Sequence, residues 1–335
     1  MNGFKLAAMA VAVAAGSASF AVKAQSVVKI DGSSTVFPIS EAAAEDFQAL
    51  KKGGVRVTVG MSGTGGGFKK FCIADQGLRT DISNASRPIT EKEMEACKAA
   101  GVKYIELPIA FDALTVVVSK NNPISSISIE DLKKMWEPAA QGKITNWKQV
   151  NAAFPDRALK LYGPGTDSGT FEYFTEAAVG KAKASRGDYT ASEDDNVLVQ
   201  GVARDQGGIG YFGYAYYAEN TDKLKALAIS PAAGKPGVLP SEKSVMDGSY
   251  VPMSRPIFIY INAESAKRPE IKEFVEFYLK NAGKFASEVK YVPLTAADYK
   301  HASDIFAKGR TGTAFGGHNE VGVKIADLLK REPKD

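Results

Sequence analysis

The chain has 335 residues, 44% of them hydrophobic, and a formal net charge of +4 at pH 7. This length can bury a substantial core and predicts two lobes. Because lysine and arginine are interleaved with acidic residues and form no basic stripe with stacked aromatic residues, nucleic-acid binding is not expected.

The first 24 residues have the pattern of a secretory signal peptide. Lys5 supplies the positive start, residues 6–15 form an apolar segment, and Val22-Lys-Ala24 offers a small-residue cleavage site. A membrane anchor is the alternative, but the apolar run is too short to span a bilayer comfortably. We therefore expect export, with cleavage near Ala24.

Cys72 and Cys97 are the only cysteines. In an exported chain an even pair predicts a disulfide. A metal site or a catalytic thiol is disfavoured, because there is no Cys-x-x-Cys and because His301 and His318 lie more than two hundred residues further along the chain.

Strand-like and helix-like segments alternate, which predicts an α/β architecture with mainly parallel sheets. The expected strands are residues 27–30, 55–59, 81–85, 104–107, 114–119, 159–162, 209–214, 224–229 and 257–261. The expected helices are residues 38–50, 91–100, 129–136, 171–179, 269–281 and 321–331. The stretch 231–252, rich in Gly, Pro and Ser, is expected to form a surface loop. Trp136 and Trp147 are expected in the core.

Three loops of similar composition each join an expected strand to an expected helix. They are Asp31-Gly-Ser-Ser-Thr-Val-Phe-Pro-Ile-Ser40, Met61-Ser-Gly-Thr-Gly-Gly-Gly67 and Gly163-Pro-Gly-Thr-Asp-Ser-Gly-Thr170. Taken singly, their Ser, Thr and Gly residues fit ordinary helix caps and turns. A helix N-terminus, however, also offers unpaired N–H groups and the positive end of the helix dipole. Three such ends meeting at one point would surround a tetrahedral oxyanion.

Two apolar runs are expected to cross between the lobes. Residues 109–118 would form the outward crossing and residues 255–261 the return. Lobe one would then comprise residues 25–112 and 255–335, and lobe two residues 113–254. Two crossings make a hinge, and a ligand would be held in the cleft between the lobes.

Five short segments form a specific combination: Asp31-Gly-Ser-Ser-Thr-Val-Phe-Pro38, Ser62-Gly-Thr-Gly-Gly-Gly-Phe-Lys69, Asn84-Ala-Ser-Arg-Pro-Ile89, Thr166-Asp-Ser-Gly-Thr-Phe171 and Gly208-Ile-Gly-Tyr-Phe212. Together they resemble the periplasmic phosphate-binding proteins of high-affinity phosphate ABC importers, from about Ser26 to the C-terminus. The resemblance implies the two-lobed α/β fold of type II periplasmic binding proteins, with a ligand cleft between the lobes, a two-strand hinge, no catalysis and no cofactor. It implies a periplasmic monomer that binds inorganic phosphate and delivers it to an ABC permease in the inner membrane.

The resemblance also implies which residues bind phosphate. The donors would be Ser34, Thr35 and Val36 in the first loop, Ser62 or Thr64 in the second, and Ser168, Gly169 and Thr170 in the third. Spacing does not decide between Ser62 and Thr64.

The sequence departs from one branch of that family at two positions. Arg87 stands where that branch has Asp, and Pro164 stands where it has Arg. Arg87 is therefore the expected cationic ligand, since a guanidinium fork suits two phosphate oxygens, with a surface ion pair as the alternative. Without the Asp of that branch, the proton of monohydrogen phosphate would be accepted by Asp167, with Asp112 as a second candidate. A helix-capping role for Asp167 is equally open.

Other functions have less support in the residues. Sulfate, thiosulfate or an oxometallate could fill the same site. A secreted phosphatase or other hydrolase is disfavoured, because Gly66 occupies the position of a P-loop Lys and neither Ser62 nor Ser168 lies in Gly-x-Ser-x-Gly. The Gly-rich residues 311–317 have no assignment and leave open a separate role in adhesion or signalling.

Overall fold

The computed structural model describes residues 25–335 except 167, 193, 233, 319–323 and 332–335. The expected signal peptide, residues 1–24, lies outside the described residues. Within the described part of the chain, no helix is both long enough and apolar enough to cross a membrane.

The elements alternate between strand and helix along most of the chain. The strands are β1 (Ser26–Gly32), β2 (Val55–Val59), β3 (Ile82–Ala85), β4 (Tyr104–Ser119), β5 (Ser126–Ser128), β6 (Lys160–Gly163), β7 (Thr190–Ala191), β8 (Gly208–Gly213), β9 (Leu224–Ala226), β10 (Ala228–Ser230), β11 (Ser254–Asn262) and β12 (Val292–Pro293). The helices are α1 (Phe37–Leu50), α2 (Thr64–Phe71), α3 (Glu91–Ala99), α4 (Ile129–Trp136), α5 (Trp147–Val150), α6 (Gly169–Phe174), α7 (Asp195–Arg204), α8 (Tyr214–Ala218), α9 (Glu242–Met246), α10 (Pro269–Glu288), α11 (Ala296–Ala307) and α12 (Ile325–Leu328). Short 3₁₀ turns lie at Pro138–Ala140 and Ser265–Lys267, and a π-helical stretch lies at Thr175–Val179.

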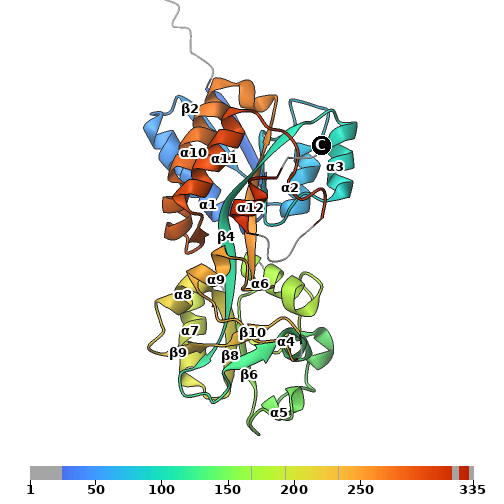
Figure 1. The fold of residues 1–335 in the computed structure, drawn as a ribbon, viewed down its shortest axis with the longest axis vertical. Helices are drawn as coiled ribbons and strands as arrows, with labels where there is room; N and C mark the ends of the chain where they lie inside the picture. Colours follow the sequence, from blue (N-terminus) through green and yellow to red (C-terminus); the bar gives the residue numbers. More distant parts are fainter. Residues whose placement is uncertain (1–24, 167, 193, 233, 319–323, 332–335) are drawn as a thin grey trace, which may run out of the picture.

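Two long strands connect two α/β lobes (Figure 1). β4 and β11 pair antiparallel over most of their length and run from one lobe into the other. All 16 residues of β4 are buried, as expected of an apolar run through the centre of the molecule. The strand order β2-β1-β3-β11-β4-β8-β6-β7 places β4 and β11 between the strands of lobe one and those of lobe two.

Lobe one is built on three parallel strands. β1 pairs with β2 on one side and with β3 on the other. α1, α10 and α11 gather on one side of β4, and α2 and α3 gather on the other (Figure 1). α1 and α10 pack through Phe47, whose ring centroid lies 5.3 Å from that of Phe274 and 5.4 Å from that of Phe277. Because parallel strands end at the same edge of a sheet, the loops after β1, β2 and β3 share one edge.

Lobe two has its own strands and an aromatic core. β8 pairs antiparallel with β4 and parallel with β6. The ring centroid of Trp136 lies 5.3 Å from that of Phe174 and 5.0 Å from that of Tyr211. Trp136 and Trp147 are 1% and 0% exposed, which confirms that both are core residues.

Some elements differ from the sequence prediction. Residues 104–107 and 114–119 are parts of one continuous strand, because β11 pairs along the segment between them, with a register shift beside Pro108. The sheet is mixed rather than mainly parallel, because the two crossing strands run in opposite directions. The predicted loop 231–252 contains α9 and the buried Tyr250. Within the predicted helix 321–331, the described residues form only α12.

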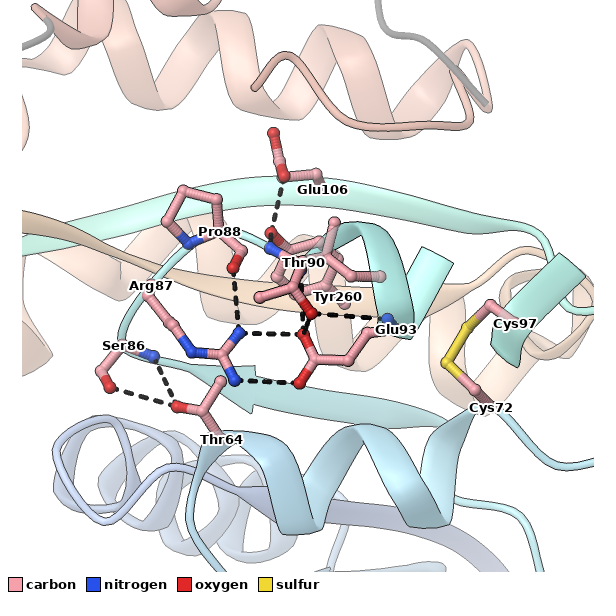
Figure 2. Close-up of polar contacts among 11 residues, drawn as sticks. Thr64, Cys72, Ser86, Arg87, Pro88, Thr90, Glu93, Cys97, Glu106 and Tyr260 are labelled. Carbon is pink, nitrogen blue, oxygen red and sulfur yellow. Dashed lines mark hydrogen bonds and ion pairs between the residues drawn. A yellow bond between two sulfur atoms is a disulfide. The ribbon is translucent and has the colours of Figure 1, made fainter. Parts of the chain in front are cut away.

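The predicted disulfide between Cys72 and Cys97 is present, with Cα atoms 4.2 Å apart (Figure 2). Cys72 directly follows α2 and Cys97 lies on α3, so the bond joins the end of α2 to α3 through two cysteines that are 25 residues apart in sequence. We expect the double substitution Cys72→Ser and Cys97→Ser to lower the free energy of unfolding by roughly 3 kcal/mol, because the unfolded chain regains the entropy of the open loop. Urea unfolding of the variant and of the reduced wild-type protein should show the same loss of stability. An unchanged midpoint in both would contradict the expectation.

Candidate functional site

The first and third Ser- and Gly-rich loops meet where the two lobes join. Thr35 precedes α1 and is 4% exposed, and Gly169 opens α6 in lobe two. A Cβ added to Gly169 would lie 2.7 Å from Oγ1 and 3.2 Å from the backbone nitrogen of Thr35. Only a residue without a side chain permits this approach, so Gly169 brings the start of α6 against the start of α1.

Two of the three expected helix starts have no side-chain cap. α1 begins after the buried Val36 and α2 begins after Gly63, and neither first turn receives a side-chain hydrogen bond. α6 differs, because Oγ of Ser168 accepts a hydrogen bond of 3.1 Å from the N–H of Thr170. That contact uses a lone pair of Ser168 and leaves its O–H free to donate elsewhere. The first turn of α2 keeps backbone N–H groups that an anion can cap, whereas at α1 the N–H groups of Phe37 and Ile39 donate to the carbonyls of Ser33 and Val36 and only the N–H of Val36 remains.

The second loop turns its two hydroxyl candidates in different directions. Oγ of Ser62 donates to the carboxylate of Asp31, which also forms an ion pair of 2.6 Å with Lys70. Oγ1 of Thr64 lies 3.1 Å from Oγ of Ser86 and accepts a hydrogen bond of 3.1 Å from the N–H of Ser86. Thr64 is therefore beside the loop that carries Arg87, whereas the Ser62 hydroxyl is engaged by Asp31.

The guanidinium of Arg87 is held by Glu93 in a two-bond ion pair (Figure 2). Nη1 donates to Oε2 and Nη2 donates to Oε1, both at 2.9 Å, and Nη1 also donates to the carbonyl of Pro88 at 3.1 Å. These contacts use three of the five guanidinium N–H donors. The Nε–H and the second Nη2–H have no partner among the described residues. Figure 2 shows Thr64 and Ser86 on this side of the guanidinium.

Both charges of the pair are stabilised by their contact. Burial alone would lower the pKa of Arg87, but the hydrogen bonds and charge of Glu93 outweigh it and raise the pKa. Burial alone would raise the pKa of Glu93, but the hydrogen bonds from Arg87 and Thr90 outweigh it and lower the pKa. Both side chains are partly buried, with 26% and 15% exposed, so Arg87 forms an ion pair, as the alternative interpretation of the sequence expected, but one that lies partly below the surface.

A second arginine, Arg255 on β11, contacts residues of lobe two at the junction. Arg255 forms ion pairs with Asp112 at 3.5 Å and with Glu176 at 3.4 Å, and its guanidinium lies 3.7 Å from the ring centroid of Tyr173. Asp112 is 1% exposed, and burial raises the pKa of its carboxyl even though Arg255 opposes the shift. Asp112 thus has a cationic partner of its own. Asp167 lies outside the described residues.

The Gly-rich residues 311–317 contact a buried carboxylate on β4. Oε2 of Glu106 accepts hydrogen bonds of 2.6 Å from the hydroxyls of Thr313 and Tyr260, and Oε1 accepts one of 2.9 Å from the N–H of Ala314. The hydroxyl of Tyr260 also accepts a hydrogen bond of 2.9 Å from the N–H of Ile89. Glu106 therefore ties this segment to the loop that carries Arg87, which gives the segment a structural role.

The structure brings the expected residues into two groups. Thr35 and Gly169 meet across the lobe junction, with Ser34, Val36, Ser168 and Thr170 next to them in sequence. Thr64 and Arg87 lie together within lobe one, with Ser86. Sequence reasoning missed Ser86 and Glu93, although Thr90-x-x-Glu93 has the spacing of a capping box, and the structure shows that box at the start of α3.

The chain is similar to a family model, to curated relatives and to solved structures. A family model described as a PBP superfamily domain matches residues 17–282. The protein SphX of Synechococcus elongatus is 55% identical over 308 residues, which cover 92% of this chain and 89% of SphX. The phosphate-binding protein PstS of Staphylococcus saprophyticus is 41% identical over 281 residues, which cover 83% of each chain. A crystal structure of what is described as a possible phosphate binding protein from Planctomyces limnophilus is 44% identical, with a TM-score of 0.79, and covers 85% of this chain and 99% of its own.

Proposed function

Because the chain belongs to the PBP superfamily and, within it, to the family of PstS phosphate-binding proteins, we propose that it captures inorganic phosphate between its lobes and delivers it to an ABC permease. It acts in the periplasm as a monomer, after removal of residues 1–24. It is a binding protein and not an enzyme. Lobe one comprises residues 25–112 and 255–335, and lobe two comprises residues 113–254.

The observation that carries this proposal is the free edge of the Arg87 guanidinium. Its Nε–H and second Nη2–H form a fork that matches two oxygens of one phosphate. Thr64 lies beside this fork and supplies a hydroxyl, while Ser62 remains with Asp31. In this proposal phosphate therefore takes its lobe-one contacts from Arg87 and Thr64 and from the start of α1.

The remaining contacts come from the loops that meet at the lobe junction. Thr35 gives a hydroxyl and Val36 a backbone N–H at the start of α1. Ser168 gives its O–H, and Gly169 and Thr170 complete the lobe-two side. Because donors from both lobes contact one ion, binding favours the closed arrangement of the lobes.

Titration calorimetry with phosphate, arsenate and sulfate tests this function directly. We expect tight binding of phosphate and arsenate, weak binding of sulfate, and no release of phosphate from a phosphomonoester in a phosphatase assay. Sulfate binding as tight as phosphate binding would assign the site to another oxyanion. If the protein hydrolyses the phosphomonoester and Arg87→Ala abolishes this activity, the site is the active site of an enzyme.

Ser168→Ala is expected to weaken phosphate binding by at least about tenfold, or about 1.4 kcal/mol, because one hydroxyl donor to the anion is lost. The same change also removes the cap of α6, which costs about 1 kcal/mol of stability. Ser128→Ala is the matched control, since Ser128 caps α4 in the same lobe through the same kind of contact. Calorimetry should show lower affinity for the Ser168 variant alone, and equal affinities would remove Ser168 from the site.

A further inference from the structure

Selective binding of phosphate requires a group that accepts its proton. Monohydrogen phosphate and sulfate have the same charge and shape, but only phosphate has an O–H to donate. A fixed carboxylate accepts that O–H, whereas against sulfate it leaves two acceptors facing each other without a proton. The specificity of the proposed phosphate site therefore depends on which carboxylate is close to the bound ion.

Several carboxylates near the lobe junction are engaged elsewhere. Asp31 accepts from Ser62 and pairs with Lys70. Asp112 and Glu176 both form ion pairs with Arg255, although the contact to Oδ2 of Asp112 is too long for a hydrogen bond. Among the described residues, this leaves Glu93 as the carboxylate in direct contact with the Arg87 fork.

The two oxygens of Glu93 have very different surroundings. Oε2 accepts from Nη1 of Arg87 and from both the N–H and the hydroxyl of Thr90, each at 2.9 Å. Oε1 accepts from Nη2 of Arg87 alone. Since each carboxylate oxygen has about two lone-pair sites, Oε1 has one left, next to the guanidinium edge that would bind phosphate.

In the first turn of α2, the position next to Oε1 of Glu93 is Gly65, which has no side chain to cover this oxygen. A Cβ added to Gly65 would lie 3.8 Å from Oε1 of Glu93 and 3.8 Å from Nη2 of Arg87. Glycine at this position places no side chain beside either group. An oxyanion on the Arg87 fork can then place a second oxygen near Oε1.

We propose that Oε1 of Glu93 accepts the hydrogen bond from the O–H of bound phosphate and makes the site reject oxyanions that have no proton. This inference rests on the proposed function. Glu93 has two roles in this proposal. Its Oε2, through the Thr90 capping box, fixes the position of the carboxylate. Its Oε1 distinguishes a ligand that has an O–H from one that has none. The lowered pKa of Glu93 keeps the carboxylate ionised when phosphate binds, as an acceptor must be.

The test compares Glu93→Gln with the wild-type protein by calorimetry at a mildly alkaline pH. The probes are phosphate, sulfate and monofluorophosphate, which are all dianions of similar size at that pH, while only phosphate carries a proton. Because the three anions carry equal charge, the loss of the Glu93 charge changes their affinities by the same factor. This factor cancels in the ratios of the affinities. We expect the preference for phosphate over sulfate, and over monofluorophosphate, to fall at least tenfold in Glu93→Gln.

Two controls separate this role from structural ones. Thr90→Val removes a hydroxyl contact to Oε2 and leaves Oε1 untouched, and Asp131→Asn alters the equivalent capping box of α4 in lobe two. Both should keep the wild-type preference, and melting temperatures report whether each variant folds. If Glu93→Gln weakens all three anions equally, Glu93 only positions Arg87 and the proposal is wrong.

If the preference for phosphate over sulfate falls in Asp167→Asn but stays at the wild-type value in Glu93→Gln, the proton acceptor is Asp167. A wild-type protein that binds no phosphate would instead overturn the proposed function, so the two failures are distinguishable.

Discussion

Replacing Arg87 with Ala is expected to weaken phosphate binding about a thousandfold, or about 4 kcal/mol. The change removes the guanidinium fork, which is the cationic part of the proposed site. It also leaves Glu93 without the partner that makes two hydrogen bonds to it. An unpaired carboxylate would then face the incoming dianion, so attraction is replaced by repulsion. Calorimetry at fixed ionic strength measures the loss.

Two further variants distinguish the fork from the charge. Arg87→Lys keeps a positive charge but has no planar pair of donors, so we expect it to recover only part of the affinity. The double variant Arg87→Ala with Glu93→Ala removes the repulsion as well as the fork, so it should bind sulfate, which has no O–H for Glu93 to accept, more tightly than Arg87→Ala alone. If the double variant binds sulfate no better than the single one, Glu93 does not face the ligand. Full affinity for phosphate in Arg87→Ala would remove Arg87 from the site.

Helices with local signals could be predicted from the sequence. Ser128 and Asp131 have capping-box spacing, and Leu132, Met135 and Trp136 share one face, so the prediction of residues 129–136 agrees with α4. The continuity of β4 could not be predicted in the same way. It depends on pairing with β11, which lies far along the chain, and Pro108 interrupts the local strand pattern.

For the candidate site, the composition of the loops could be predicted, but not the direction in which their side chains point. The three loops were recognisable from their Ser, Thr and Gly residues. The choice between Ser62 and Thr64 depends on the backbone of Gly63, whose φ of 76° lies in the left-handed region that favours glycine. That turn separates a hydroxyl bound to Asp31 from one bound to Ser86. Sequence reasoning weighed Arg87 as a ligand or as an ion pair, whereas the structure gives it an ion pair with Glu93 and a free edge as well.

The hinge strands carry the second large expected effect, on stability. Asp112 of β4 and Arg255 of β11 face each other across the ladder, and their side chains are 2% and 14% exposed. We expect Arg255→Met to lower the free energy of unfolding by about 3–5 kcal/mol at neutral pH, because it leaves the buried carboxylate of Asp112 without a partner. The double variant with Asp112→Asn should recover most of that loss, since no buried charge then remains. Urea unfolding of the three proteins measures the differences.

The pH dependence of this loss identifies its cause. In the folded protein the pKa of Asp112 lies above its ordinary value, so its protonated form favours folding, and that stability is lost as pH rises from the unfolded pKa toward the folded one. Arg255 opposes this shift, so Arg255→Met raises the pKa of Asp112 in the folded protein further. The pH range over which stability is lost then becomes wider. The cost of the substitution should therefore be small at about pH 3.5, where Asp112 is largely protonated in both states, and should grow as the pH rises. Arg268→Met is the matched control, because Asp81 keeps its hydrogen bonds from Ser265 and from the N–H of Lys29 and should show a smaller cost. An Arg255→Met cost that stays constant with pH would show that packing on Tyr173, and not the charge of Asp112, holds the hinge together.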